Sequence, residues 1–320
     1  FKQKTAYEIP KRDWSSDVCS SDLGCCPTIR CNWVIAFRQC PKATWLLMFL
    51  FSRCVPMADI SYDKHGKVRL ITIRRADKMN SLDFAANDAL IEIWRAFEAD
   101  QDARVAVITG EGEQAFCAGA DLKTYTLAFA QTAAPEFRHQ YTNGPGFGGI
   151  TRHLDIDKPI LAAINGYAIS GGFELALACD LRFCSPNAEF ALQDAKWGFH
   201  ACDGGLIRLP QIVGLGHAME IILSGERIDA EHAYRIGLVN RIHPQKELLT
   251  QTLDYAQMLA SRAPLSHRFA KEVIRRSVGM TLSEALQWES RSFRDVAMTE
   301  DLKEGLASFK ERRPAQFKGR

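Results

Sequence analysis

The stretch from residue 165 to residue 180 constrains the fold of this chain more than any other. It reads NGYAISGGFELALACD and follows the apolar run PILAAI, which is typical of a buried strand bounded by a proline. The Ala- and Leu-rich residues after Gly171 and Gly172 predict a buried helix. A strand, a glycine turn and a helix N-terminus together aim free backbone N–H groups at one point. That point suits an anion, or an oxygen that becomes negative during a reaction.

Glu174 lies in the first turn of this predicted helix, beside the N–H donors. A carboxylate there often only compensates the helix dipole, but beside an oxyanion site it can also act as an acid or base. Ser170 precedes the glycine pair, yet no G-x-S-x-G elbow surrounds it, so a serine hydrolase is disfavoured. His200 and Asp203 fall in a glycine-rich turn. Solvated polar residues are commoner in such turns, so we expect neither residue to be catalytic.

The first 56 residues show no helical or strand periodicity. They hold six of the ten cysteines and three of the six tryptophans, and the cysteine spacing fits no zinc pattern. Residues 1–23 resemble translated sequencing-adapter read-through, and the pattern becomes protein-like only after Met57. We therefore expect residues 1–56 to be a disordered, non-native leader, and we exclude them from the fold prediction.

Charge and cysteine usage exclude several classes of partner. The net charge of the chain is +2, but the leader alone carries +4, so the remaining chain is at −2 and does not favour nucleic acid. The apolar run 45–51 is far too short to span a bilayer, so we expect no membrane association. Four cysteines remain at unpaired spacings, which favours reduced thiols and a cytoplasmic location.

Strands alternating with helices predict a parallel α/β core. We expect a helix from Asp83 to about Asp100, with Ser81 as its N-cap, and another from Ala230 to Ile236, with Asp229 as its N-cap. The long, glycine-rich insertion over 124–151 is expected to be a mobile, substrate-facing loop. The pattern is helical from Lys246 onward, so we expect an α/β core over 57–245 and a helical segment over 246–320. Strands are expected at 60–63, 68–73, 105–109, 159–164, 181–184 and 188–192.

A second cluster of small residues, AFCAGADLK over 115–123, follows the strand predicted at 105–109. By itself it is best explained as a tight turn, although it can also supply N–H donors. Asp194 lies just after the strand predicted at 188–192 and places a second carboxylate at a loop exit.

Four segments taken together resemble the enoyl-CoA hydratase/isomerase (crotonase) family. They are 80–82, 115–122, 159–180 and the FKERRP run at 309–314. The resemblance covers nearly all of 57–320 and implies a spiral of ββα units with a helical C-terminal segment. It also implies homotrimers, or dimers of trimers, that bind an acyl-CoA substrate. No metal and no cofactor are expected, since CoA is part of the substrate.

The resemblance also implies roles for individual residues. The backbone N–H groups of Ala118 and Gly171 would form the oxyanion hole, and Glu174 would be the first catalytic carboxylate. Asp194 stands where a second glutamate is usual and is shorter by one C–C bond, about 1.5 Å. Ala201 stands where a proline is usual. The residues implied to bind substrate are Ala118, Gly119, Ala120, Asp121 and Gly171.

The activity implied is that of a lyase that hydrates a 2-enoyl-CoA to a 3-hydroxyacyl-CoA. Two N–H donors would stabilise the enolate-like thioester oxygen, each by about 3 kcal/mol in the transition state. Two carboxylates would hold a water and exchange protons with the substrate, and their repulsion should raise one pKa. One carboxylate alone suffices for double-bond isomerisation, which is the alternative. A non-catalytic CoA-binding or assembly protein is the alternative from another class.

Overall fold

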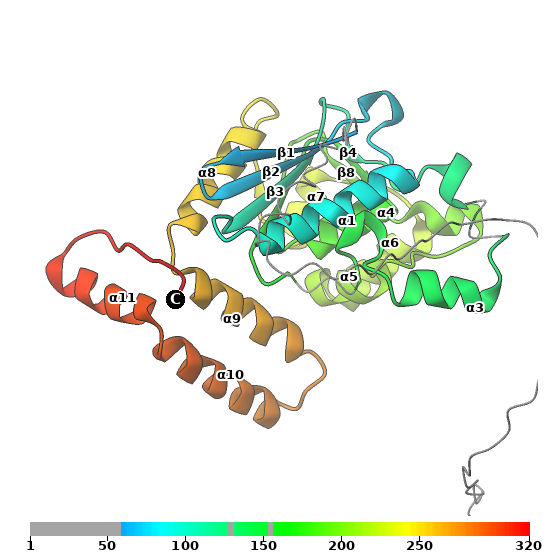
Figure 1. Cartoon of the computed structure of the whole chain (residues 1–320). Coiled ribbons are helices and arrows are strands. Elements are labelled where there is room, and N and C mark those ends of the chain that lie inside the picture. Colours follow the sequence, from blue (N-terminus) through cyan, green and yellow to red (C-terminus); the bar gives the residue numbers. More distant parts are fainter. Residues whose placement is uncertain (1–58, 127, 129–130, 153–155) are drawn as a thin grey trace, which may run out of the picture. The chain divides into compact units, whose positions relative to one another are not determined.

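The computed structural model describes residues 59–126, 128, 131–152 and 156–320 (Figure 1). The predicted leader, 1–56, lies outside the described residues. The described chain builds two sheets. One has six strands in the order β1-β2-β3-β5-β7-β10, and the other has four in the order β4-β6-β8-β9. Strands β1 and β2 pair antiparallel, as do β8 and β9, and the other pairs are parallel.

All six predicted strands are present, but four further strands, β4, β6, β9 and β10, were not predicted. The six-stranded sheet consists of β1 Ile60–His65, β2 Val68–Ile73, β3 Val105–Gly110, β5 Ile160–Ile164, β7 Leu181–Cys184 and β10 Arg241–Ile242. The four-stranded sheet consists of β4 Ala115–Cys117, β6 Tyr167–Ile169, β8 Glu189–Ala191 and β9 Ile228–Asp229.

From β3 to β8, successive strands alternate between the two sheets. β3, β5 and β7 belong to the larger sheet, and the strand that follows each of them, β4, β6 or β8, belongs to the smaller one. Helical segments then lead to the next pair: α4 (Gly171–Ala178) follows β6, and η5 (Gln193–Trp197) with α5 (Gly205–Val213) follows β8. This repeat is the predicted spiral of ββα units, so the predicted fold class is confirmed.

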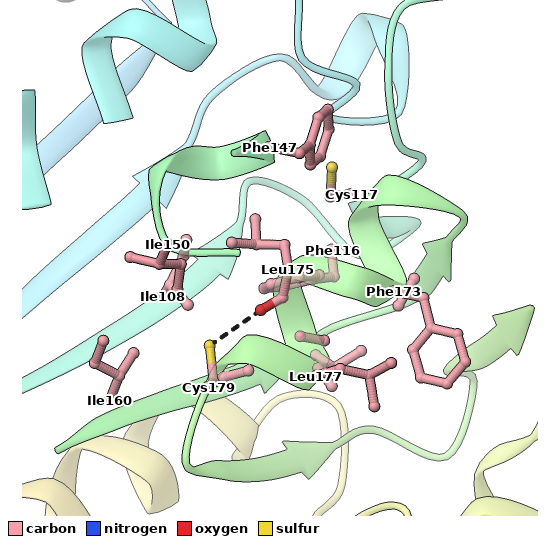
Figure 2. Packing of buried hydrophobic residues seen from close by; sticks show 14 of the residues in the cluster. Ile108, Phe116, Cys117, Phe147, Ile150, Ile160, Phe173, Leu175, Leu177 and Cys179 are labelled. Carbon is pink, nitrogen blue, oxygen red and sulfur yellow. Dashed lines mark hydrogen bonds between the residues drawn. The ribbon is translucent and has the colours of Figure 1, made fainter. Parts of the chain in front are cut away.

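The central strands β3 and β5 of the larger sheet are buried on both faces because they are almost wholly apolar. On one face, Val105 and Val107 of β3 belong to a cluster with Ala256 of helix α8 (Leu248–Ala260). On the other face, Ile108 belongs to the main core cluster with Trp94 of α1 (Phe84–Ala99). Figure 2 shows part of this second cluster. By its packing, α8 is therefore a layer of the core, although it lies beyond the predicted core boundary at residue 245.

Of two predicted helix N-caps, one is wrong and one is correct. Helix α1 is capped by Asp83, whose side chain accepts from the Ala86 N–H at 2.9 Å. The predicted cap, Ser81, is wrong: it lies in the preceding loop, too far from the free N–H groups of the first turn. Asp229 caps α7 (Ala230–Arg235) as predicted, accepting from His232 N–H at 2.7 Å.

The insertion over 124–151 is not a uniformly open loop. Its described parts form the short segments η2 Leu122–Thr126, α3 Ala134–Phe137, η3 Arg138–Thr142 and η4 Phe147–Gly149. The glycine-rich end is buried against α1, where the Trp94 indole donates to the Gly148 carbonyl at 2.8 Å and Asn87 accepts from Gly148 N–H at 2.7 Å. These contacts hold η4 in place, so the predicted mobility is wrong for this end.

The C-terminal segment consists of α9 (Pro264–Arg276), α10 (Leu282–Ala297) and α11 (Glu300–Glu311). Lys271 of α9 forms a 2.7 Å ion pair with Asp180, just after α4. Helix α6 spans Leu215–Ser224, and the 3₁₀ helix η1 spans Ala76–Lys78. Within the described residues, no helix combines the length and apolar character needed to cross a membrane.

Candidate active site

Two glycines let the turn after β4 lie directly against the N-terminus of α4. A Cβ on Gly172 would lie 1.9 Å from the carbonyl oxygen of Cys117. A Cβ on Gly119, whose φ is +94°, would lie 2.9 Å from the carbonyl oxygen of Ile169. Any side chain at these positions would push the two backbones apart. The small residues of both motifs therefore serve the same close contact, which the sequence alone left open for 115–123.

Backbone strain gathers around this contact. Among the described residues other than glycine, four have positive φ, and three of them, Met79, Asn80 and Ser170, lie in loops at the site. The fully buried Asn80 side chain accepts from Arg75 N–H at 2.9 Å and donates to Ala115 O at 2.7 Å. These bonds hold the loop in a conformation that costs free energy, as is common at functional sites. The 80–82 motif is thus explained as support for the site.

The two backbone N–H groups that the resemblance implied as oxyanion donors are not equally free. Gly171 opens α4, so its N–H has no partner within the helix. The Ala118 N–H, however, donates to the Met79 carbonyl at 3.0 Å and is therefore not free. Ala120 lies two residues further on, and its N–H finds no acceptor among the residues that the structure describes. Ala118, Ala120 and Gly171 all line one cavity, and because the Ala118 N–H is occupied, Ala120 and Gly171 are the candidate N–H donors there.

A cavity of about 540 Å³ lies in front of these N–H groups. Its walls are mostly apolar, and its polar groups come from the first turn of α4 and from the chain after β8. Such a combination is typical of a site that binds a small molecule. The residues that line it are Ala118, Ala120, Leu122, Phe137, Phe147, Ile169, Ser170, Gly171, Glu174, Gln193, Asp194, Trp197, Phe199, His200, Cys202 and Asp203.

Glu174 is buried in the wall of this cavity, 2 % exposed. Its Oε1 accepts from the backbone N–H groups of Asp203 at 2.7 Å and Gly205 at 2.8 Å. Oε2 accepts no hydrogen bond within the described part of the chain, which leaves it available to a ligand. Burial, followed by the negative charge of Asp203, raises the pKa of Glu174 to about 8, and the two N–H donors only partly oppose this. The charge of Asp194 raises it further.

Asp194 reaches the same cavity from η5, a 3₁₀ helix, where the sequence predicted a loop exit. Asp194 is 6 % exposed, and burial raises the pKa of its carboxyl, opposed by its own backbone N–H and by a hydrogen bond from the Ser170 side chain. Oδ2 is enclosed and has no partner among the described residues. The structure thus brings Glu174 and Asp194 to one cavity, and it gives Ser170 a supporting contact to Asp194.

The turn over 198–204 holds the residue that sequence reasoning missed. His200 is exposed, in line with the prediction. Asp203, in contrast, is only partly exposed, and its carboxylate accepts hydrogen bonds from Phe147, Thr151 and Arg152. The one feature of the sequence that could have pointed to Asp203 is its position directly before the glycines at the start of α5. In the part of the chain that the structure describes, no group of three or more His, Cys, Asp or Glu side chains is placed to hold a metal ion.

Comparison with known proteins decides the family. The model of the enoyl-CoA hydratase/isomerase family matches residues 63–320. The chain belongs to the enoyl-CoA hydratase/isomerase family. The family resemblance of the four sequence segments is thereby confirmed, and the cavity with its N–H donors and buried carboxyls is the candidate active site of this family member.

Relatives within the family cover the same part of the chain. It is 39 % identical over 266 residues to a carnitinyl-CoA dehydratase of Citrobacter koseri, covering 82 % of this chain and 98 % of the relative. A carnitinyl-CoA dehydratase of Salmonella typhi is 40 % identical over 262 residues, covering 80 % and 97 %. The fold matches the enoyl-CoA hydratase of Bacillus anthracis with a TM-score of 0.73 at 34 % identity, covering 82 % of this chain and 100 % of that one. The enoyl-CoA hydratase of Mycobacterium tuberculosis matches with 0.74 at 31 %, covering 82 % and 99 %.

Proposed function

We propose that this protein catalyses the reversible addition of water to the Cα=Cβ bond of a 2-enoyl-CoA, giving a 3-hydroxyacyl-CoA. One observation carries the proposal: two free N–H donors, Ala120 and Gly171, and two buried carboxyls, Glu174 and Asp194, line the same apolar cavity. Its relatives include proteins named dehydratase and proteins named hydratase, and removing and adding water are the two directions of this reaction.

The N–H donors act on the thioester. When water adds at Cβ, electrons move through Cα onto the carbonyl oxygen, which becomes enolate-like. Donors that already point at that oxygen stabilise it without reorganising, each by about 3 kcal/mol. The Gly171 N–H is further favoured because it lies at the positive end of α4. Binding the thioester oxygen between Gly171 and Ala120 also places Cα and Cβ next to the carboxyls.

The two carboxyls handle the protons. Hydration needs one group to accept a proton from water and another to give a proton to Cα, so the pair must hold one proton in total. Burial raises the pKa of both Glu174 and Asp194, the charge of Asp203 adds to both shifts, and the charge of Asp194 adds to that of Glu174. These shifts favour one shared proton near neutral pH. The water reacts at Cβ, its proton moves to the ionised carboxyl, and Cα takes its proton from the protonated one.

Double-bond isomerisation is the second candidate, and one observation favours it. The Oδ2 atom of Asp194 is enclosed and unpaired among the described residues, so only part of this shorter carboxyl faces the cavity. If Asp194 does not reach the water, Glu174 alone can still move a proton between Cα and a carbon further along the acyl chain.

The test is a panel of acyl-CoA thioesters of graded chain length, read by mass spectrometry for water addition and by NMR for double-bond movement. We expect water addition with at least one 2-enoyl-CoA. Double-bond movement without water addition would support the isomerase. Tight binding of acyl-CoA without any turnover would support a non-catalytic CoA-binding protein instead.

Two substitutions separate the roles of the carboxyls. Glu174→Gln removes the proton carrier beside the donors, so we expect hydration and α-proton exchange in deuterated solvent both to fall by about 10²-fold or more. Asp194→Asn should lower hydration by a similar factor but leave α-proton exchange measurable. Normal hydration by Asp194→Asn would show that Asp194 is structural and that Glu174 holds the water alone.

A further inference from the structure

Asp203 occupies a position where several parts of the active site meet. Its Oδ1 accepts from Phe147 N–H at 3.1 Å, from Thr151 Oγ1 at 3.1 Å and from Arg152 Nε at 3.2 Å. Its Oδ2 accepts from the Cys202 thiol at 3.6 Å. Protein donors thus occupy both oxygens of this carboxylate. It is therefore poorly placed to exchange protons with a substrate, and well placed to hold its neighbours.

The first of these neighbours is Phe147, a wall of the active-site cavity. Phe147 is 5 % exposed and is one of the clustered residues drawn in Figure 2. Its ring lies so close to Gly171 that a Cβ there would meet ring carbons at 3.0 to 3.2 Å. The segment 147–151 that carries this ring is held on one side by α1, through Asn87, and on the other by Asp203.

The second neighbour is Glu174. The backbone N–H of Asp203 donates to Glu174 Oε1 at 2.7 Å, and the Asp203 carbonyl accepts from Arg208 Nη1 at 3.2 Å. Arg208 also donates to the Thr151 carbonyl at 2.8 Å, and Arg152 donates to the Cys202 carbonyl. The turn that carries Asp203 is thus tied to segment 147–151 by two arginines as well as by its own carboxylate.

We propose that Asp203 is a positioning residue for the proposed reaction: its carboxylate holds segment 147–151 against the cavity while its backbone N–H holds the Glu174 carboxyl. This inference rests on the proposed function. Asp203 joins Phe147, the aromatic wall that bounds the space for the thioester, to the acid/base Glu174 in one hydrogen-bonded unit. A movement of either one then changes the geometry of the other.

The negative charge of Asp203 has a second, electrostatic effect on the same unit. After burial, it is the largest influence that raises the pKa of Glu174, ahead of Asp194. The charged and titratable groups around Glu174 are Asp194 from η5, Cys202 and Asp203 from the turn, and Arg208 from α5. Removing one negative charge from this set lowers the pKa of Glu174, because the ionised form is then repelled less.

Two variants separate the two effects. Asp203→Asn keeps an Oδ1 acceptor for Phe147 and Thr151 and replaces only the oxygen that faces Cys202. Asp203→Ala removes both the acceptor and the charge. Asp88→Asn is the matched control, because it removes the same charge from an exposed residue of the neighbouring helix α1.

The measurements are the pH dependence of kcat/KM, the KM at the optimum, and the titration of the Glu174 carboxyl in the free enzyme. The last is read as a ¹³C or infrared difference against the same chain carrying Glu174→Gln. We expect both Asp203 variants to move the Glu174 midpoint to lower pH by roughly half a unit or more. We expect KM to rise about tenfold in Asp203→Ala and to stay within about twofold of the natural chain in Asp203→Asn. The control should change neither quantity.

Each outcome decides the inference. An unmoved Glu174 midpoint in both variants, or equal KM values for Asp203→Ala and Asp203→Asn, would overturn it. If the natural chain hydrates nothing, the proposed function fails. In that case the Glu174 titration, together with the dissociation constant of a saturated acyl-CoA in place of KM, still tests Asp203 on its own.

Discussion

At the scale of single residues, the chemistry of this site depends on how its carboxyls are surrounded. Glu174 is 2 % exposed, and its pKa is raised to about 8 by burial and by Asp203. An isolated surface glutamate would be ionised at neutral pH and would only accept protons. Burial therefore turns Glu174 into a group that can both give and take a proton near pH 7.

The raised pKa also has a consequence for stability. Between about pH 4.5 and about pH 8 the folded chain holds a proton on Glu174 that the unfolded chain has released. Folding is therefore favoured at the low end of this window, and the contribution is lost as pH rises through the folded-state value. We expect Glu174→Gln to change stability little near pH 5 and to raise the free energy of unfolding increasingly up to pH 8. The gain should reach a few kcal/mol at most, because one pKa unit corresponds to about 1.4 kcal/mol.

Urea unfolding at pH 5, 6, 7 and 8 measures this difference. Glu92→Gln, at an exposed position on α1, is the control and should give a difference that does not depend on pH. A constant difference for Glu174→Gln as well would mean that burial does not raise the pKa of Glu174 in the folded protein.

At the scale of elements, the site depends on the contact between the turn after β4 and the N-terminus of α4. The Ala120 and Gly171 N–H groups belong to different elements, and they share one cavity because Gly172 lets the two backbones touch. The same contact places Ser170, with φ +47°, at the start of the helix.

Gly172→Ala tests this contact. The added Cβ would lie 1.9 Å from the Cys117 carbonyl, and neither partner is a flexible side chain. We expect a loss of about 2 kcal/mol or more in the free energy of unfolding, because overpacked cores typically lose 1–3 kcal/mol. Gly216→Ala, on α6, is the control: its Cβ meets nothing within 4 Å, and it should be neutral or stabilising by up to about 1 kcal/mol. Chemical denaturation compares the two, and equal stabilities would contradict the close contact.

At the scale of the whole molecule, the C-terminal helices present apolar side chains to solvent. Leu282 and Phe293 of α10 are 77 % and 72 % exposed, and Phe309 of α11 is 86 % exposed. Large apolar side chains gathered on one segment commonly mark a contact between chains. The family resemblance implies trimers or dimers of trimers, and these helices are the surface we propose for that contact.

Self-association is therefore expected in solution. Light scattering coupled to size-exclusion chromatography should give three or six times the mass of one chain, which is 35.8 kDa for the full sequence. Phe293→Glu combined with Leu282→Glu should shift the protein toward monomers, because each places a charge in the contact. Gln287→Glu, exposed on the same helix, adds the same charge to a polar position and should leave the mass unchanged. A monomeric natural chain would contradict the proposed surface.

Local patterns were enough to predict much of the fold. Six strands could be predicted because apolar runs and bounding glycines or prolines lie within a few residues of each other, whereas the short strands β4, β6, β9 and β10 lack such a pattern. The α7 cap could be predicted because Asp229 lies next to the N–H groups that it binds. The position of Glu174 in the first turn of α4 was predicted correctly for the same reason, since it lies within one helical turn of the glycine pair.

What the tertiary structure alone decided were the choices between hydrogen-bond partners that are distant in sequence. The Met79 carbonyl accepts a hydrogen bond from the Ala118 N–H, so the N–H that is left free is that of Ala120. Asp203, predicted to be solvated, is bound by Thr151 and Arg152 because the two segments meet only in the folded chain. The sequence determines which groups can donate or accept. Two such groups pair only if the fold brings their segments within about 3 Å of each other. The periodicity of the sequence carries no information on which distant segments meet.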